Sequence, residues 1–566
     1  MKKLILTICL LLCCIASQVF ARTPLMPVDN LRAGMRGYAK TVISGDTIET
    51  FPVEILGVTG SETLGYQILM RGSGEVLDRS GGIAQGMSGS PVYIDGKLVG
   101  AIAFGKAFTD PHYCLLTPIQ DMLELLDRPV PHREQADSSL LPKGTALMAG
   151  GFSKEGIALL EQELASAGIT VMDTGASGKE SSSRDLEPGS SVGVALVQGD
   201  VSLGALGTVT WTDETGRLIA FGHPFMQRGN TDFFLTKTWV LASLPNLQTA
   251  YKIGNIGEAA GSVTQDRSAG VAGQIGRLPS YIPLYVSVTD SSRSNNGSMR
   301  AKVVNDEQLA PALLSSIMVS QASKVADQGS GGSARVRFDI TAMDSKEELL
   351  HINRENMYFD KNSIIKPLPV ELQETVQVLL QNKLEKVRIT NVDVNVDMST
   401  EILVAEIKKV SVEEKKVRPG DTIHLNVTMK PYRGEEMTRT VAYKLPKDAA
   451  GEIRLKVRGG ASMSWIKELL RRQKDEGVPQ ENKEKQKESK KEKDIKLSDY
   501  VREVNSADRN NDIIVEYAPD MGRRAVPDEE GEEETLASML AGGRNKQSVP
   551  VDFIVDGEVQ LTVRLP

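Results

Sequence analysis

The chain has 566 residues, of which 66 are lysine or arginine and 74 are aspartate or glutamate, and its formal net charge is -8. Basic residues are interleaved with acidic ones, so the charge pattern gives no indication of a nucleic-acid partner. A chain of this length is expected to form about three or four domains. Its 51 glycines and many short valine and isoleucine runs predict a mainly β fold.

The first 21 residues, MKKLILTICLLLCCIASQVFA, have the pattern of a secretory signal peptide. Two lysines precede an apolar stretch that ends in Val19-Phe20-Ala21, and we expect cleavage after Ala21. No later stretch approaches the roughly 18 apolar residues that a membrane-spanning helix needs. The mature chain is therefore expected outside the cytoplasm, in the periplasm, at the cell surface or secreted, with no transmembrane segment.

Cysteine usage argues against a disulfide scaffold. Cys9, Cys13 and Cys14 lie in the predicted signal peptide, which leaves Cys114. One thiol cannot form an internal disulfide. We expect Cys114 to be a small apolar residue in a strand rather than a reactive thiol.

The N-terminal half is expected to contain two β units joined by a helix. Alternating β-branched residues bounded by glycine and aspartate predict the first unit at residues 30–127, where IDGK is a hairpin turn and PIQDMLELL a closing helix. Helical spacing of apolar residues in KEGIALLEQELASAGI (154–169) predicts a linker helix within residues 143–186. The second β unit follows at residues 187–298.

The remaining chain is expected to form a mixed α/β connecting region at residues 299–384, with ALLSSIMVSQASKVAD as a helix. Clean alternation from VRITNVDVNVDM to EIRLKV predicts a β-sandwich-like domain at residues 385–462. The charged and polar stretch at residues 471–494 predicts a solvated linker or an exposed helix within a charged linker at residues 463–498. Residues 499–566, with the acidic loop DEEGEEE, are expected to form a C-terminal β region that contacts an envelope protein partner.

The hexapeptide Gly86-Met87-Ser88-Gly89-Ser90-Pro91 fits the G-x-S-G-x-P pattern of serine peptidases. Glycines let the backbone turn tightly, so that N–H groups point at the developing oxyanion while the serine Oγ faces the substrate. Ser88 is the candidate nucleophile, the N–H groups of Gly86 and Ser88 are the candidate oxyanion donors, and Ser90 is expected to line the pocket floor. The alternative is a glycine-rich hairpin with two turn-forming serines.

A serine hydroxyl needs a base, and the chain has five histidines: His112, His132, His223, His351 and His424. His223 is the candidate, because in LIAFGHPF a strand runs directly into Gly-His-Pro and would hold the ring rigidly. The alternative for it is ordinary packing. There is no H-E-x-x-H motif, no histidine pair and no cysteine set, so neither a metal nor a cofactor is expected.

SGGIAQGMSGSP, DGKLVGAIAF and TPIQDMLELL occur in the order of the final segment of the stage IV sporulation protein B serine peptidases, and the chain resembles that family there. Residues 34–58 resemble the strand pair before the nucleophile. Residues 190–200 and GTVTWTDETGRLIAFGH (207–223) resemble the family's histidine half. In the family that half comes first, whereas here Ser88 precedes His223, as if the domain were circularly permuted. The resemblance implies a trypsin-like double β-barrel at residues 22–298.

The family's acid has no counterpart, because Ser73 stands at the matching position. An aspartate there would orient the imidazole and stabilise the imidazolium. Asp232, in RGNTDFF, is the first substitute, since it follows His223 closely enough to return across a hairpin. Asp266, in VTQDRSAG, is the second. The alternative for either is a solvated turn residue.

These observations predict an exported serine endopeptidase that cleaves protein or peptide substrates through an acyl-enzyme. Ser88 would attack the scissile carbonyl, and His223 would act first as base and then as acid. A different class is a non-catalytic envelope binding or structural protein that retains the barrel, which the missing aspartate favours. A third possibility is self-processing within the exposed stretch 471–494.

Overall fold

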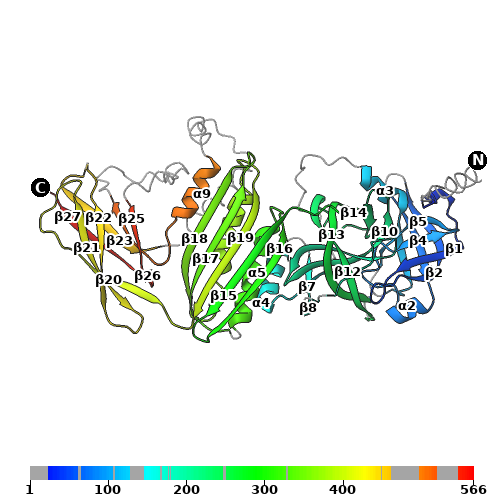
Figure 1. Cartoon of the computed structure of the whole chain (residues 1–566), viewed down its shortest axis with the longest axis horizontal. Helices are drawn as coiled ribbons and strands as arrows, with labels where there is room; N and C mark the ends of the chain where they lie inside the picture. The colour runs from blue at the N-terminus through cyan, green and yellow to red at the C-terminus, as the bar shows by residue number, and fades with distance from the viewer. Residues whose placement is uncertain are drawn as a thin grey trace, which may run out of the picture.

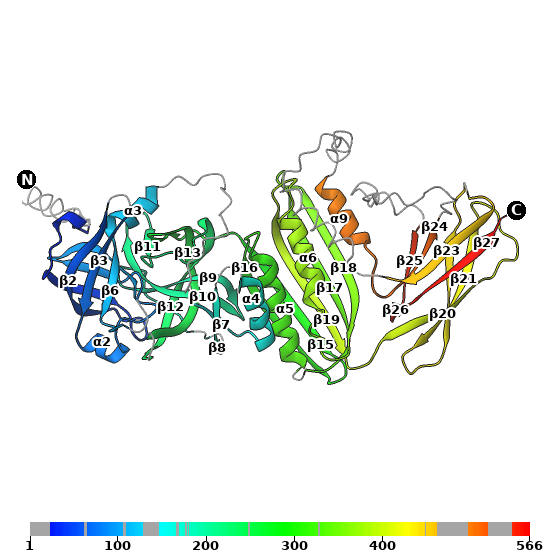
Figure 2. The same ribbon diagram turned by 180° about the vertical axis from the view of Figure 1, so that it is seen from behind.

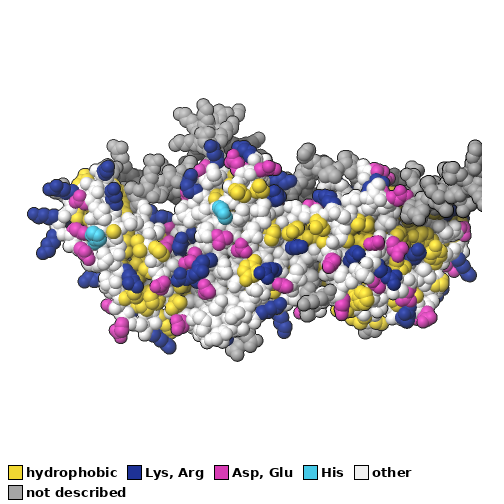
Figure 3. All heavy atoms as spheres, viewed as in Figure 1, with side chains coloured by type: hydrophobic (Ala, Val, Ile, Leu, Met, Phe, Trp, Pro, Cys, Tyr) yellow, Lys and Arg dark blue, Asp and Glu magenta, His cyan; other side chains and the backbone are white. Residues whose placement is uncertain are grey.

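The computed structural model shows an elongated molecule, with the N-terminal barrel at one end and the C-terminal strands at the other (Figure 1). It describes residues 23–61, 65–105, 109–127, 146–165, 169–175, 178, 180–246, 250–326, 329–447, 449–460, 496–518 and 546–565. The predicted signal peptide, most of the predicted charged linker and the acidic loop lie outside these residues. On the face shown in Figure 3, side chains of both charges are interspersed.

Six antiparallel strands close the first barrel in the order β1-β2-β3-β6-β5-β4. They are β1 (Arg36–Thr41), β2 (Glu49–Ser61), β3 (Gly65–Gly72), β4 (Pro91–Ile94), β5 (Lys97–Phe104) and β6 (Tyr113–Pro118). The predicted hairpin turn joins β4 to β5, with positive φ at Asp95 and Gly96, as a type I′ turn requires. Apolar side chains that alternate along the strands fill the interior. The helices α2 (Glu75–Ser80) and α3 (Ile119–Asp127) complete the unit.

A second ring of six strands lies within a 13-stranded sheet. It contains β9 (Ser191–Gly199), β10 (Ser202–Thr212), β11 (Arg217–Ala220), β12 (Gly229–Leu244), β13 (Tyr251–Arg267) and β14 (Gly270–Ile275). Because β9 pairs with both β10 and β12, the ring closes in the order β9-β10-β11-β14-β13-β12. Within each barrel the strands therefore follow the order one, two, three, six, five, four. The double β-barrel expected from the resemblance is confirmed.

The segment between the barrels contains more than the predicted linker helix. α4 (Lys154–Leu164) connects β7 (Ala146–Gly150) to β8 (Thr170–Gly175), and these two strands pair in parallel. β7 also pairs with β10, so this segment extends the edge of the second barrel. The two strands are short, and their alternation is too brief to be distinguished from loop in the sequence.

The middle of the molecule is formed by five long strands that continue the 13-stranded sheet beyond β9, and two helices cover one face of them (Figure 2). Its strands are β15 (Tyr281–Asp290), β16 (Asn295–Val304), β17 (Gly332–Met343), β18 (Leu349–Asp360) and β19 (Arg388–Ser399), and its helices are α5 (Ala310–Ala326) and α6 (Pro369–Leu380). The sequence placed β15 in the histidine half and β19 in the sandwich, whereas the two pair with each other in parallel. Alternation shows that one face of a strand is buried, but it does not identify the neighbouring strand.

The C-terminal sandwich has two four-stranded sheets. One contains β20 (Val404–Val412), β21 (Thr422–Pro431), β22 (Met437–Lys444) and β26 (Ile554–Asp556), and the other β23 (Glu452–Gly459), β24 (Asp512–Ala518), β25 (Lys546–Pro550) and β27 (Glu558–Arg564). The described strands of the predicted C-terminal β region are therefore part of the sandwich, whereas α9 (Leu497–Ser506) packs against β18. Among the described residues, no helix is long and apolar enough to cross a membrane.

Candidate active site

The loop that carries Ser88 connects β3 and α2 to β4, between the third and fourth strands of the first barrel. Gly86 and Gly89 have φ of +90° and +92°, a region that side chains strongly disfavour. The Gly89 N–H donates to the carbonyl of Ile102 at 2.7 Å, and the Ile102 N–H donates to the carbonyl of Ser90 at 3.0 Å. The loop is thus fixed to β5, while Ser88 itself is half-buried and Ser90 is fully buried.

Backbone N–H groups of this loop divide into two sets. Those of Gln85, Met87, Gly89 and Ser90 donate to carbonyls at 2.7 to 2.9 Å. Those of Gly86 and Ser88 have no acceptor among the described residues. Backbone donors are rarely left without a partner unless water or a ligand can take them. The two unpaired donors are those that the sequence predicts for an oxyanion.

His223 lies in the connection from β11 to β12, which is again the one between the third and fourth strands of its barrel. Its Nδ1 is 2.8 Å from the carbonyl oxygen of Pro224. Because a carbonyl only accepts, Nδ1 carries the proton and Nε2 keeps its lone pair. The rings of Phe104 and Phe221 each lie 6.0 Å from the imidazole, centroid to centroid. Burial lowers the pKa of His223, so the ring is a neutral base at neutral pH.

The two loops meet across β5 and β10. The Thr208 N–H donates to the carbonyl of Ser88 at 2.8 Å, and the carbonyl of Thr208 accepts the Phe221 N–H at 3.3 Å. On the other side, a methyl group on Gly222 would lie 2.9 Å from the carbonyl oxygen of Ile102, which binds Gly89. The structure therefore brings the Ser88 and His223 loops into one region, although no hydrogen bond among the described residues joins the two side chains.

Two threonines of β10 fasten the serine loop to the second barrel. The Thr208 hydroxyl donates to the carbonyl of Gly86 at 3.1 Å, and the Thr210 hydroxyl donates to that of Gly89 at 2.7 Å. Both side chains are fully buried. Nothing in the sequence indicates these contacts, because threonine is an ordinary strand residue and the carbonyl groups it binds lie more than a hundred residues away.

Neither predicted aspartate contacts the imidazole in this structure. Asp232 accepts from the Arg277 guanidinium at 3.0 Å and from the Ser280 N–H at 2.7 Å. The position next to Nδ1 that an acid would occupy is taken by the Pro224 carbonyl. Asp232 as the triad acid therefore has no support from this geometry and stays a prediction from the sequence.

Asp266 is fully buried and holds the segment that follows His223. Its carboxylate accepts from the N–H groups of Phe225, Met226 and Arg228 at 2.7, 2.8 and 3.2 Å. Burial raises its pKa to about 6 even though these three donors favour the charged form. Asp266 thus fixes the backbone of the segment that follows His223. It does not bind the imidazole ring itself.

The other residues that the sequence singled out have other partners or lie on other elements. Ser73 is exposed, and His112 pairs with the exposed Asp110. His351 lies on β18 and His424 on β21, while His132 is outside the described residues. Cys114 is a buried thiol in β6, and burial raises its pKa, as expected of a structural residue.

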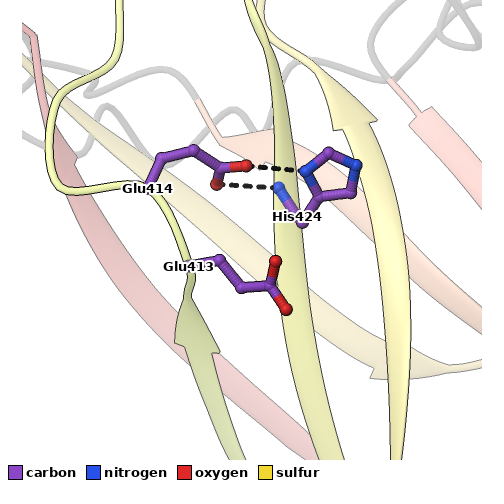
Figure 4. A group of neighbouring side chains, drawn as sticks. All are labelled: Glu413, Glu414 and His424. Atoms are coloured by element: carbon purple, nitrogen blue, oxygen red, sulfur yellow. Dashed lines mark hydrogen bonds and ion pairs between the residues drawn. The ribbon is translucent and has the colours of Figure 1, made fainter.

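One group of side chains in the described part of the chain could hold a metal ion. Glu413, Glu414 and His424 place ligand atoms within 4.8 Å of one another on the hairpin from β20 to β21 (Figure 4). Glu414 already binds both Nδ1 and the N–H of His424, at 2.6 and 2.9 Å. Glu413 accepts from Asn426. The group lies in the sandwich rather than near Ser88, and each of its three side chains already has a hydrogen-bond partner.

Comparison with known proteins gives one match. Residues 22–123 match the family model described as SpoIVB peptidase S55. The matched segment spans the first barrel and includes the Ser88 loop. No curated protein and no solved structure matches the chain. The resemblance of the first barrel to that serine peptidase family is thereby confirmed.

Proposed function

We propose that the chain is a serine endopeptidase whose nucleophile is Ser88 and whose base is His223. The observation that carries the proposal is the pair of unpaired N–H groups at Gly86 and Ser88, since the neighbouring donors of the loop are all bonded. The tautomer of His223 and the family match over residues 22–123 support it.

The proposed reaction is acyl transfer through Ser88. Ser88 Oγ attacks the scissile carbonyl carbon as its proton moves to His223 Nε2, and the N–H groups of Gly86 and Ser88 bind the oxyanion. The C–N bond then breaks as His223 returns the proton to the leaving amine. Water, deprotonated by His223, releases the acyl group and regenerates Ser88.

The Pro224 carbonyl would substitute in part for the missing acid. It holds the proton on Nδ1 and so leaves Nε2 unprotonated, which is one role of a triad aspartate. As a neutral dipole it stabilises an imidazolium less than a carboxylate would. We therefore expect slow turnover, because loss of the triad carboxylate costs up to about 10⁴-fold in rate.

Covalent labelling tests the proposal directly. The mature chain would be treated with a fluorophosphonate probe, beside the variants Ser88→Ala and His223→Ala. Attack by Ser88 Oγ forms the O–P bond and expels fluoride, and the oxygen's proton goes to His223. Labelling should disappear in Ser88→Ala and fall by at least about 100-fold in His223→Ala. Ser73→Ala, an exposed serine of the same barrel, is the matched control and should label normally.

Absence of labelling in folded wild-type protein would favour the second candidate, an envelope binding protein that retains the barrel. The observation on its side is that no described carboxylate contacts the His223 ring. Self-processing is tested by the mass of the mature chain, since a cut within residues 471–494 should vanish in Ser88→Ala.

Export belongs to the same proposal. It is supported by the charged start, apolar stretch and small-residue site of residues 1–21. An N-terminal sequence that begins at Arg22 in protein recovered outside the cytoplasm is the expected result. Full-length protein in the cytoplasm would contradict it.

A further inference from the structure

Lys252, near the start of β13, contacts the serine loop from within the protein. Its N–H donates to the carbonyl of Gln85 at 2.9 Å, and the Gln85 N–H donates to the carbonyl of Ala250 at 2.7 Å. A methyl group built on Gly86 would lie 3.1 Å from both Cβ and Cδ of Lys252 and 3.2 Å from Cγ. The aliphatic part of the lysine therefore packs directly on the glycine that supplies one candidate oxyanion donor.

The amine end of Lys252 has an unusual environment. The residue is completely buried, and its Nζ donates to the Thr41 hydroxyl at 3.2 Å. Among the described residues, no carboxylate forms an ion pair with it. A buried ammonium without a counter-ion is costly, and burial lowers the pKa of Lys252 to about 7. The amine therefore gains and loses its proton near neutral pH.

Charged groups on the surrounding elements are engaged elsewhere. The loop from residue 81 to 90 contains no titratable side chain, and β12 places Ser243 opposite Lys252. Next to Thr41, Lys40 lies over the Tyr93 ring, 5.5 Å from its centroid. Glu49, the register partner of Thr41, pairs with Arg79, and the adjacent residue on β13 is Tyr251.

We propose that Lys252 is a positioning residue of the oxyanion site: its aliphatic part packs on Gly86, and its amine, when protonated, adds a positive charge to this region as negative charge develops on the substrate. The proposal rests on the proposed function, since it concerns the oxyanion that Ser88 would form. At the effective dielectric constant of about 20 typical of proteins, a unit charge about 6 to 12 Å from the oxyanion changes the rate about 100- to 10-fold, and we expect an effect in this range.

Two groups then limit the reaction from opposite sides of the pH scale. His223 must be neutral to accept the proton, which favours higher pH, and Lys252 must be protonated, which favours lower pH. The rate of fluorophosphonate labelling in the wild type should therefore follow a bell-shaped pH profile. Its alkaline limb, the fall in rate at high pH, should reflect deprotonation of Lys252.

The test compares labelling rates between pH 5 and pH 10 in wild type, Lys252→Met and Thr41→Val. Lys252→Met keeps the aliphatic contact with Gly86 and removes the charge, so the alkaline limb should vanish and the rate at pH 6 should fall about 10- to 100-fold. Thr41→Val removes the acceptor of the ammonium and should move the limb to lower pH. A purely structural role of Lys252 predicts neither change in the profile.

The outcomes separate the two proposals. Labelling of the wild type with an unchanged profile in Lys252→Met would overturn the role of Lys252 and leave the peptidase assignment intact. No labelling of the folded wild type at any pH, with Ser88→Ala equally silent, would overturn both.

Discussion

Replacing Lys252 by methionine should make the protein more stable at neutral pH. The pKa of the amine falls from 10.5 to about 7 on folding, which corresponds to a destabilisation of about 5 kcal/mol below pH 7. Methionine avoids this cost but leaves the Thr41 hydroxyl without its partner, which costs about 1 kcal/mol or more. The expected net gain for Lys252→Met at pH 7 is about 2 to 4 kcal/mol.

The pH dependence identifies the cause. Between about pH 7 and 10.5 the unfolded chain carries a proton on Lys252 that the folded chain lacks, so wild-type stability rises with pH across this window. The difference in the free energy of unfolding between Lys252→Met and the wild type should therefore decrease by about 2 to 3 kcal/mol between pH 7 and pH 9. Packing changes caused by the methionine are the same at both values and cancel from this difference.

Denaturant unfolding followed by tryptophan fluorescence suits the measurement, because Trp211 and Trp239, two of the three tryptophans, lie in the second barrel. Lys97→Met, at an exposed hairpin position, is the control and should change stability by less than about 0.5 kcal/mol at either pH. A gain in stability for Lys252→Met that is equal at pH 7 and pH 9 would refute a buried amine whose pKa is lowered to about 7.

Four further predictions concern the serine loop, two aspartates and the thiol. Gly89→Ala places a methyl group 2.0 Å from a carbonyl oxygen of β10 and should abolish labelling, whereas Gly96→Ala, with similar φ and open space, should keep it at a cost of about 1 to 2 kcal/mol. Asp266→Ala leaves three N–H groups of the histidine loop without their acceptor and should cost about 2 to 4 kcal/mol and lower the labelling rate. Asp232→Ala breaks a partly exposed ion pair and should cost at most about 1 kcal/mol with labelling retained; abolished labelling in a folded protein would instead restore it as the acid. Cys114 should react with a maleimide only after unfolding, and rapid reaction of the native protein would contradict its burial.

Sequence reasoning found those parts of the site that depend on local backbone geometry. The glycines of GMSGSP are required where the chain turns with positive φ, and that requirement is visible in the residue types. The Gly-His-Pro turn at a strand end is equally local. Hydrophobic periodicity likewise predicted β structure in residues 30–127 and 187–298 and the helices α3, α4 and α5.

Pairing across long sequence separations was decided by the tertiary structure. Alternation in YIPLYVSV (281–288) and VRITNVDVNVDM (387–398) predicted two strands, yet their parallel pairing was not visible, because alternation shows which face is buried and not which strand is the neighbour. The same holds for Thr208 and Thr210, whose hydroxyls reach the serine loop only because the barrels pack together.

The residue types alone thus predict a β-rich chain, a serine loop whose glycines allow positive φ, and a histidine held at a strand end. Only the fold decided that both loops occupy the same connection in two barrels of identical strand order, and that a carbonyl rather than an aspartate binds Nδ1 of His223. The fold also packs the aliphatic part of Lys252 against Gly86. The reason is physical: residue type fixes which conformations a segment can adopt, whereas burial and the partners of polar groups are set by segments distant in the chain.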